Sequence, residues 1–139
     1  MHARNFVITD NQEGDTSESV RRRVLGRLEE EGFAGTSVFI QHPCDWFVIG
    51  GRWSGVLSGE PVSPRDSYCD IGYEDDAAIL TEPLWDKFVT GGKQYPIEGP
   101  QEILWEGVAF IYLDHPYSGL VKESAIGGSK WIVVLDIHY

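Results

Sequence analysis

One stretch in the middle of the chain constrains the fold most, because an apolar run there stops at two glycines. Residues 45–49 are rich in aromatic and β-branched side chains, which predicts a short β-strand. Gly50 and Gly51 end this strand, since consecutive glycines favour turn conformations that other residues avoid. Arg52 and Trp53 follow immediately. The strand is therefore expected to lead into a turn that presents a cation and an aromatic ring.

Two interpretations of this turn stay open. In the first, the N–H groups of the two glycines converge on an anion, Arg52 adds a planar guanidinium, and Trp53 or Trp46 stacks on a ring. In the second, the turn is a bulged hairpin in which Arg52 pairs with Asp45 or Asp136 and the tryptophan packs in the core. The spacing matches neither the P-loop nor the dinucleotide-binding glycine pattern. The first interpretation therefore specifies an anionic ligand but no known nucleotide-binding motif.

The C-terminal residues 130–139 predict the last strand, and its two faces differ. Side chains alternate between the faces of a strand. The odd-numbered side chains are all apolar or aromatic: Trp131, Val133, Leu135, Ile137 and Tyr139. On the even-numbered face, two apolar residues are followed by Asp136 and His138. An Asp-x-His pair on one side of a strand orients an imidazole for proton transfer or shares a divalent ion, and the alternative is a solvated strand end.

The remaining elements predict an α+β domain. Strands are expected at 5–9, 37–41, 107–113 and 120–124, and helices at 16–31 and from Thr81 onward, while 76–80 is compatible with either structure. The first helix carries one apolar stripe, formed by Val20, Val24, Leu25 and Leu28. The order predicts a single antiparallel sheet with two helices on one face, and a mixed sheet is the alternative. A ferredoxin-like core with an extra β-hairpin is the specific expectation.

Composition limits the classes of function. The 139 residues fit one domain, 1–139, and 22 acidic against 11 basic residues give a net charge of −11, which disfavours direct nucleic-acid binding. No apolar run is long enough to span a membrane and no signal peptide is recognised, so a cytoplasmic location is expected. Cys44 and Cys69 form no CxxC pair. We therefore expect reduced thiols rather than a disulfide, and neither a metal nor another cofactor.

Residues 45–55 and 133–138 together resemble an uncharacterised family of small proteins from tailed bacteriophages and actinobacteria. The members carry a central DWYxIGGRWxG motif and a C-terminal VVDxH motif, and the matching segments cover some 20 to 25 of the 139 residues. This chain lacks the Cys-rich insert of some relatives, so the resemblance implies no zinc site. It implies no mechanism either. It does pair Arg52 and Trp53 with Asp136 and His138 as features that occur together.

Two functions follow as hypotheses. The first is a domain that binds, and hydrolyses or sequesters, a small anionic, nucleotide-like ligand. Its candidate ligand-binding residues are Gly50, Gly51, Arg52, Trp53, Asp45 and Trp46, and its candidate catalytic residues are Asp136 and His138. The second is an acidic phage-type protein that inhibits a basic host protein, such as a defence nuclease. Its motivation is the net charge together with an acidic run, Asp70, Glu74, Asp75 and Asp76, whose plainer interpretation is a solvated loop.

Overall fold

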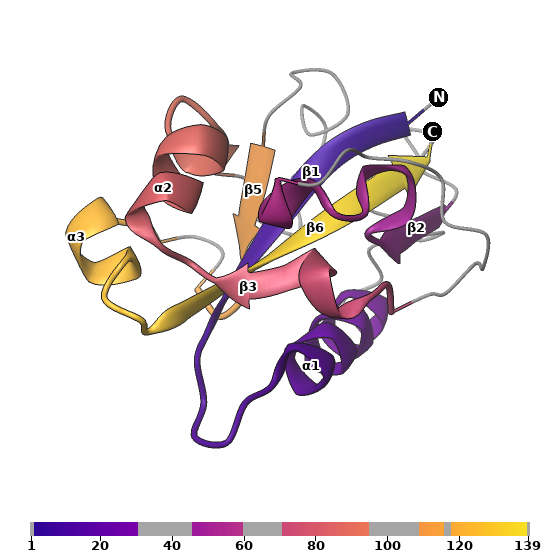
Figure 1. Ribbon diagram of the computed structural model, residues 1–139, viewed down its shortest axis with the longest axis horizontal. Helices are drawn as coiled ribbons and strands as arrows, with labels where there is room; N and C mark the ends of the chain where they lie inside the picture. The colour runs from indigo at the N-terminus through magenta and orange to yellow at the C-terminus, as the bar shows by residue number, and fades with distance from the viewer. Residues whose placement is uncertain (1, 31–45, 60–70, 95–108, 116–117, 139) are drawn as a thin grey trace.

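The computed structural model describes residues 2–30, 46–59, 71–94, 109–115 and 118–138, and it is an α+β domain with one open, mixed sheet (Figure 1). The strands run in the order β2-β6-β1-β5-β4, and β3 also pairs with β6. Their bounds are β1 His2–Asp10, β2 Trp46–Ile49, β3 Ala77–Ile79, β4 Lys93–Gln94, β5 Ala109–Tyr112 and β6 Lys130–His138. The predicted α+β class is confirmed.

The centre of the sheet is the long antiparallel pair of β1 and β6. The pair extends from His2 opposite His138 to Asp10 opposite Lys130, so the two ends of the chain lie side by side (Figure 1). On its other side β1 runs parallel to β5, and β5 runs parallel to β4. The mixed sheet, which was the alternative, is therefore the one observed. A ferredoxin-like sheet is antiparallel throughout, and these parallel pairs depart from it.

The outer edge of β6 is shared by two short strands placed end to end. β2 pairs with the C-terminal part of β6, where Trp46 lies opposite His138, and β3 pairs with its N-terminal part, where Ala77 lies opposite Val133. The expected strand at 37–41 lies outside the described residues. Because β2 and β3 meet at the middle of β6, the turn that leaves β2 comes next to the turn that enters β3.

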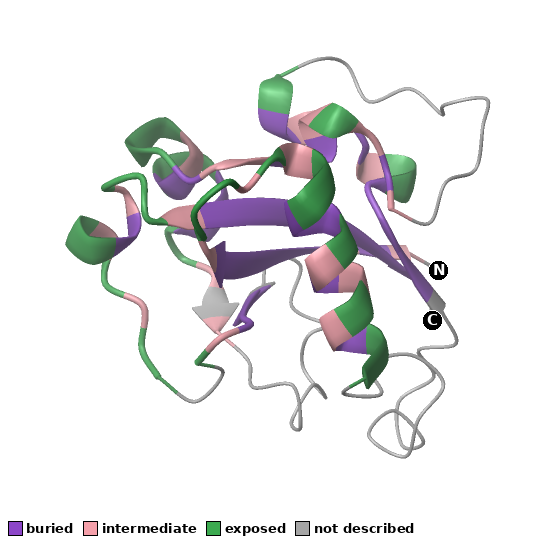
Figure 2. Ribbon diagram, turned by 90° about the horizontal axis from the view of Figure 1, so that it is seen from below, coloured by how far each residue is buried: buried purple, intermediate pink, exposed green. Residues whose placement is uncertain are grey.

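Helices cover both faces of the sheet, so the expectation of helices on one face is wrong (Figure 2). On one face lies α1, Ser17–Glu30, whose Val20, Val24 and Leu28 pack against the odd-numbered side chains of β6. On the other face lie α2, Glu82–Leu84, its π-helical continuation Trp85–Val89, and α3, Lys122–Ala125. The physical reason is that β1 and β6 carry apolar side chains on both faces, and each one buried contributes about 1.5–3 kcal/mol.

The strand expected at 120–124 is also wrong, because residues 122–125 form α3. A strand there has no place beside β5 or β6, because both strands are already flanked on each side. The ambiguous residues 76–80 contain strand β3. None of the helices in the described part of the chain has the length and apolar character needed to cross a lipid bilayer.

Candidate functional site

Asp136 joins the turn after β2 to the start of β1. Its side chain lies on the even-numbered face of β6 and is only 2% exposed. One carboxylate oxygen, Oδ2, accepts a hydrogen bond from the backbone N–H of Arg52 at 2.8 Å, and Oδ1 lies 2.7 Å from Nδ1 of His2. Burying a carboxylate is costly unless its oxygens are hydrogen-bonded, and both oxygens here have partners. The buried carboxylate thereby holds together three segments that are distant in the sequence.

The two glycines of the turn are required by close approach as well as by conformation. Gly50 has a φ of 77° and Gly51 a φ of 52°, both in the region that L side chains rarely adopt. A Cβ on Gly51 would lie 2.6 Å from Cβ and Oδ2 of Asp136 and 2.7 Å from Cγ2 of Val48. A Cβ on Gly50 would collide with the carboxylate of Asp76. The glycines therefore allow the turn to pack directly against two buried carboxylates.

Asp76 is the second of these carboxylates, and the expectation of a solvated acidic loop is wrong for it. It is fully buried and accepts hydrogen bonds from Ser54 Oγ at 2.8 Å, Gly55 N–H at 3.0 Å and Tyr73 N–H at 2.8 Å. Its only sequence signal was its position directly before the apolar residues 77–80. Glu74, by contrast, is exposed, and Asp70 lies outside the described residues.

Backbone N–H groups of the turn donate hydrogen bonds to acceptors within the chain. The 3-10 turn Gly51–Trp53 is closed by the N–H of Trp53, which donates to Gly50 O at 2.9 Å, and the N–H of Ser54 donates to Gly51 O at 3.2 Å. The N–H of Gly50 donates to Val134 O at 2.8 Å, which continues the ladder between β2 and β6. With the N–H of Arg52 directed to Asp136, these donors already have acceptors within the chain. An anion at this turn would therefore not find these four N–H groups free, and it would depend mainly on side chains.

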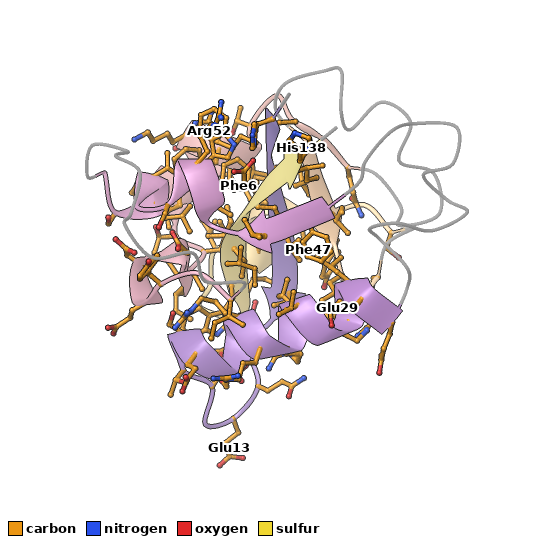
Figure 3. All side chains as sticks on the ribbon, turned by 90° about the vertical axis from the view of Figure 1, so that its right-hand side faces the viewer. Phe6, Glu13, Glu29, Phe47, Arg52 and His138 are labelled. Atoms are coloured by element: carbon orange, nitrogen blue, oxygen red, sulfur yellow. The ribbon has the colours of Figure 1, made fainter. Side chains whose placement is uncertain are left out.

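Two guanidinium groups lie at this end of the molecule. Arg52 is exposed, and Figure 3 shows it at the same end as His138 and opposite to Glu13. Arg4, on the even-numbered face of β1, is half-buried, and its Cζ lies 5.5 Å from the ring centroid of Trp53 and 5.7 Å from that of Phe88. Within the described part of the chain, neither guanidinium has a carboxylate or another hydrogen-bond acceptor. Trp53 is also half-buried, and its Nε1–H lacks an acceptor.

His2, like Arg4, is a site residue that the sequence analysis missed. It is directly opposite His138 in the β1–β6 pair, and the two imidazole centroids lie 5.0 Å apart with the rings edge to face at 76°. The imidazole in contact with Asp136 is therefore that of His2, from another strand. A signal was present: residues 2, 4, 6 and 8 change from polar to apolar, and this mirrors the even-numbered face of β6.

The structure thus places six residues at one end of the sheet: His2, Arg4, Arg52, Trp53, Asp136 and His138. Of the other candidates, Asp45 lies outside the described residues, and for Trp46 only its backbone position opposite His138 in β2 is described. Cys44 and Cys69 also lie outside the described residues. Across the ranges that the structure describes, no group of three His, Cys, Asp or Glu side chains is placed to hold a metal ion.

The opposite end of the sheet carries a closed charge network. Lys130 Nζ lies 2.8 Å from Asp10 Oδ1, and the Tyr112 hydroxyl donates to the same oxygen at 3.0 Å. Burial alone would raise the pKa of Asp10, but the hydrogen bonds from Lys130 and Tyr112 outweigh it and lower the pKa. Because these three groups satisfy one another, we assign this end a structural role.

Comparisons with protein-family models, with curated proteins and with solved structures find no match for this chain. The resemblance to the phage and actinobacterial family therefore stays a prediction. The function has to be argued from the six residues themselves.

Proposed function

We propose that this domain binds a small anionic ligand that carries a ring, such as a nucleotide, on a donor surface formed by Arg4, Arg52 and Trp53. The single observation that supports the proposal most is that Arg4 lies 5.5 Å from the ring centroid of Trp53, the neighbour in sequence of the exposed Arg52, and that neither guanidinium has an acceptor in the described part of the chain. In a chain with twice as many acidic as basic residues, arginines without acidic partners are unexpected. A phosphate or carboxylate is the group that a guanidinium fork matches best.

Several other cations of the chain, in contrast, have acidic partners. Arg23 lies 2.8 Å from Asp15, Lys130 lies 2.8 Å from Asp10, and even the exposed Arg22 lies 3.2 Å from Glu18. Arg4 is in addition half-buried, so its charge loses part of its hydration without gaining an acceptor among the described residues. A bound anion would supply that acceptor. The donor surface is therefore the part of this acidic domain best suited to a ligand of negative charge.

The ring of the ligand is assigned to Trp53. A base stacked on an aromatic side chain is worth about 1–3 kcal/mol, and a guanidinium close to the same ring adds a cation–π contribution. Arg4 lies 5.5 Å from the centroid of the Trp53 ring, so the charge and the stacking surface are adjacent. This is the arrangement expected for a ligand whose phosphate and ring are joined by a short linker.

The alternative is an acidic protein that covers a basic surface of a host protein. It is favoured by the net charge of −11. The acidic run supports this function less than the sequence suggested, because Asp76 is buried and does not contribute to an acidic surface. We therefore rank this function second.

Titration calorimetry with adenosine 5′-monophosphate, at low and at moderate salt, tests the proposed function. Arg52→Ala should weaken binding by about tenfold or more, because it removes a charge-assisted hydrogen bond worth about 1.5–3 kcal/mol. Arg4→Met should have a similar effect. Arg22→Ala is the matched control, since it removes an exposed guanidinium at another place and should leave the affinity unchanged. No detectable binding by the wild type, or an equal loss in Arg22→Ala, would overturn the proposal.

A further inference from the structure

We propose that His2 and His138 form an acid–base pair that hydrolyses a phosphodiester bond of the bound anion, and that Asp136 is the positioning residue for His2. This inference rests on the proposed function, because the donor surface has to hold the phosphate. It assigns to the site a reaction and to His2 a role that the sequence did not indicate.

Asp136 fixes the orientation of His2. The carboxylate is 2% exposed and lies 2.7 Å from Nδ1 of the imidazole. A carboxylate accepts, so Nδ1 carries a proton, and in the neutral imidazole Nε2 is then the basic nitrogen. The other carboxylate oxygen is fixed by the N–H of Arg52. The two contacts therefore fix the orientation of the carboxylate. The carboxylate in turn fixes the tautomer and the orientation of the His2 imidazole.

A second imidazole lies beside the first. His138 lies opposite His2 on the neighbouring strand, with 5.0 Å between the ring centroids. Asp136 and His138 share one face of β6, so both imidazoles belong to the same surface of the sheet. Two imidazoles at this spacing can serve one phosphorus centre, one removing a proton and the other supplying one.

Charged groups lie close to the pair in the described part of the chain. Asp136 and His138 from β6 contact His2, Arg4 follows His2 on the same face of β1, and Arg52 belongs to the turn that Asp136 holds. Arg4 and Arg52 thus come from segments directly attached to the pair, and donors preorganised for the negative charge that develops on phosphoryl oxygens stabilise a transition state strongly.

The reaction balances with water as the only co-reactant. The water oxygen forms a bond to phosphorus, and its proton passes to Nε2 of His2. The bond between phosphorus and the ester oxygen breaks, its electron pair leaves with that oxygen, and the oxygen takes a proton from the His138 imidazolium. The products are a phosphate monoester and an alcohol. Proton exchange with solvent then returns both imidazoles to their starting states.

Two probes that differ in the leaving group separate the roles of the two histidines. Adenosine 2′,3′-cyclic monophosphate releases an alkoxide, which needs a proton, and bis(4-nitrophenyl) phosphate releases a nitrophenolate, which does not. His2→Asn keeps a donor toward Asp136 and should lower the hydrolysis of both probes by about 100-fold or more, the usual worth of a general base. His138→Asn should lower only the hydrolysis of the cyclic nucleotide.

Asp136→Asn tests the positioning role of Asp136. The readout is the pH–rate profile, which would not change if Asp136 were only structural. The amide still offers one oxygen to the N–H of Arg52, but its NH₂ group turns the His2 tautomer so that Nε2 is protonated. Turnover should fall by about 100-fold or more while the affinity for adenosine 5′-monophosphate is kept, and the basic limb of the pH–rate profile should change. His115→Asn, an exposed histidine beside Tyr112 at the other end of the sheet, is the control and should leave turnover unchanged.

The outcomes distinguish this inference from the proposed function. If the wild type binds adenosine 5′-monophosphate but hydrolyses neither probe, or if His2→Asn is as active as the wild type, the acid–base pair is overturned and the binding function stands. If the wild type does not bind the nucleotide at all, both fall. Melting temperatures of the variants, measured alongside, show that each compared protein is folded.

Discussion

The backbone N–H of Arg52 donates a hydrogen bond of 2.8 Å to Oδ2 of Asp136, a residue 84 positions away in the sequence. Through this bond the turn after β2 is attached to the last strand, and the side chain of Arg52 is left exposed. Asp76 attaches the other end of the turn through Ser54 and Gly55. The turn is therefore held between two buried carboxylates, which is how its arginine and tryptophan obtain defined positions.

Gly51→Ala should destabilise the protein by about 2–4 kcal/mol, because strain at positive φ adds to the cost of overpacking. The new Cβ would meet Asp136 at 2.6 Å and Val48 at 2.7 Å. Gly128→Ala is the matched control: its φ is 83°, but nothing lies within 4 Å of the added Cβ. Urea denaturation should show the larger loss for Gly51→Ala, and equal losses would mean that the close approach to Asp136 has no energetic weight.

Asp76→Ala should lower the free energy of unfolding by about 3–5 kcal/mol, since buried donors without an acceptor cost about 1–3 kcal/mol each. The variant removes the acceptor of the N–H groups of Gly55 and Tyr73 and of the Ser54 hydroxyl. Glu74→Ala, an exposed neighbour in the same short turn, should change stability by less than about 0.5 kcal/mol. Chemical denaturation of the two variants makes the comparison, and a mild effect of Asp76→Ala would contradict the role of this carboxylate.

Asn5→Leu should raise stability by about 1 kcal/mol, because a buried polar group without a partner is replaced by an apolar group of similar shape. The Asn5 side chain is fully buried, and neither its Oδ1 nor its Nδ2 has a hydrogen-bond partner. Asn11→Leu should have the opposite sign, since Asn11 Oδ1 accepts from Trp131 Nε1 at 2.8 Å and its amide donates to Gly128 O at 3.1 Å. Thermal melts of both variants give the signs, and a lower melting temperature for Asn5→Leu would refute the prediction.

The pair of Asp15 and Arg23 should make stability depend on pH in the acid range. Arg23 donates to both carboxylate oxygens, at 2.8 and 2.9 Å, and this hydrogen bonding lowers the pKa of Asp15 from 3.8 to about 2. A carboxyl group whose pKa is lower in the folded state contributes stability above its unfolded pKa, and this contribution is lost as pH falls. The destabilisation caused by Asp15→Asn should therefore be complete above about pH 4 and shrink toward pH 2.

The same substitution in an Arg23→Met background is the control for this prediction. Without the guanidinium, the main cause of the lowered pKa of Asp15 is removed. Asp15→Asn should then show a weaker dependence on pH between about 4 and 2. An unchanged dependence would assign the effect to another group.

Local patterns predicted the elements and their faces well where the period of the side chains was clear. The helix expected at 16–31 is observed as Ser17–Glu30, with Val20, Val24 and Leu28 in the core. The alternation along β6 is confirmed too, because Val133 and Leu135 pack on the α1 side while Ile132 and Val134 pack on the opposite side. The strand predicted at 120–124 is wrong because its apolar residues fit a strand and a short helix equally well, and β5 and β6 are already flanked on each side.

The sequence by itself determined which residues share a face, that the strand at 45–49 ends in glycines, and that Asp136 and His138 stand together at the polar end of the last strand. Only the tertiary structure decided what those residues meet. It placed His2 on Asp136 across 134 positions, set Arg4 beside Trp53, and buried Asp76 under the turn. The physical reason is that side-chain periodicity follows from the local geometry of one strand or helix. The choice of neighbouring strand, and with it the partner of each buried carboxylate, depends on how the whole chain satisfies its hydrogen bonds and fills both faces of the sheet.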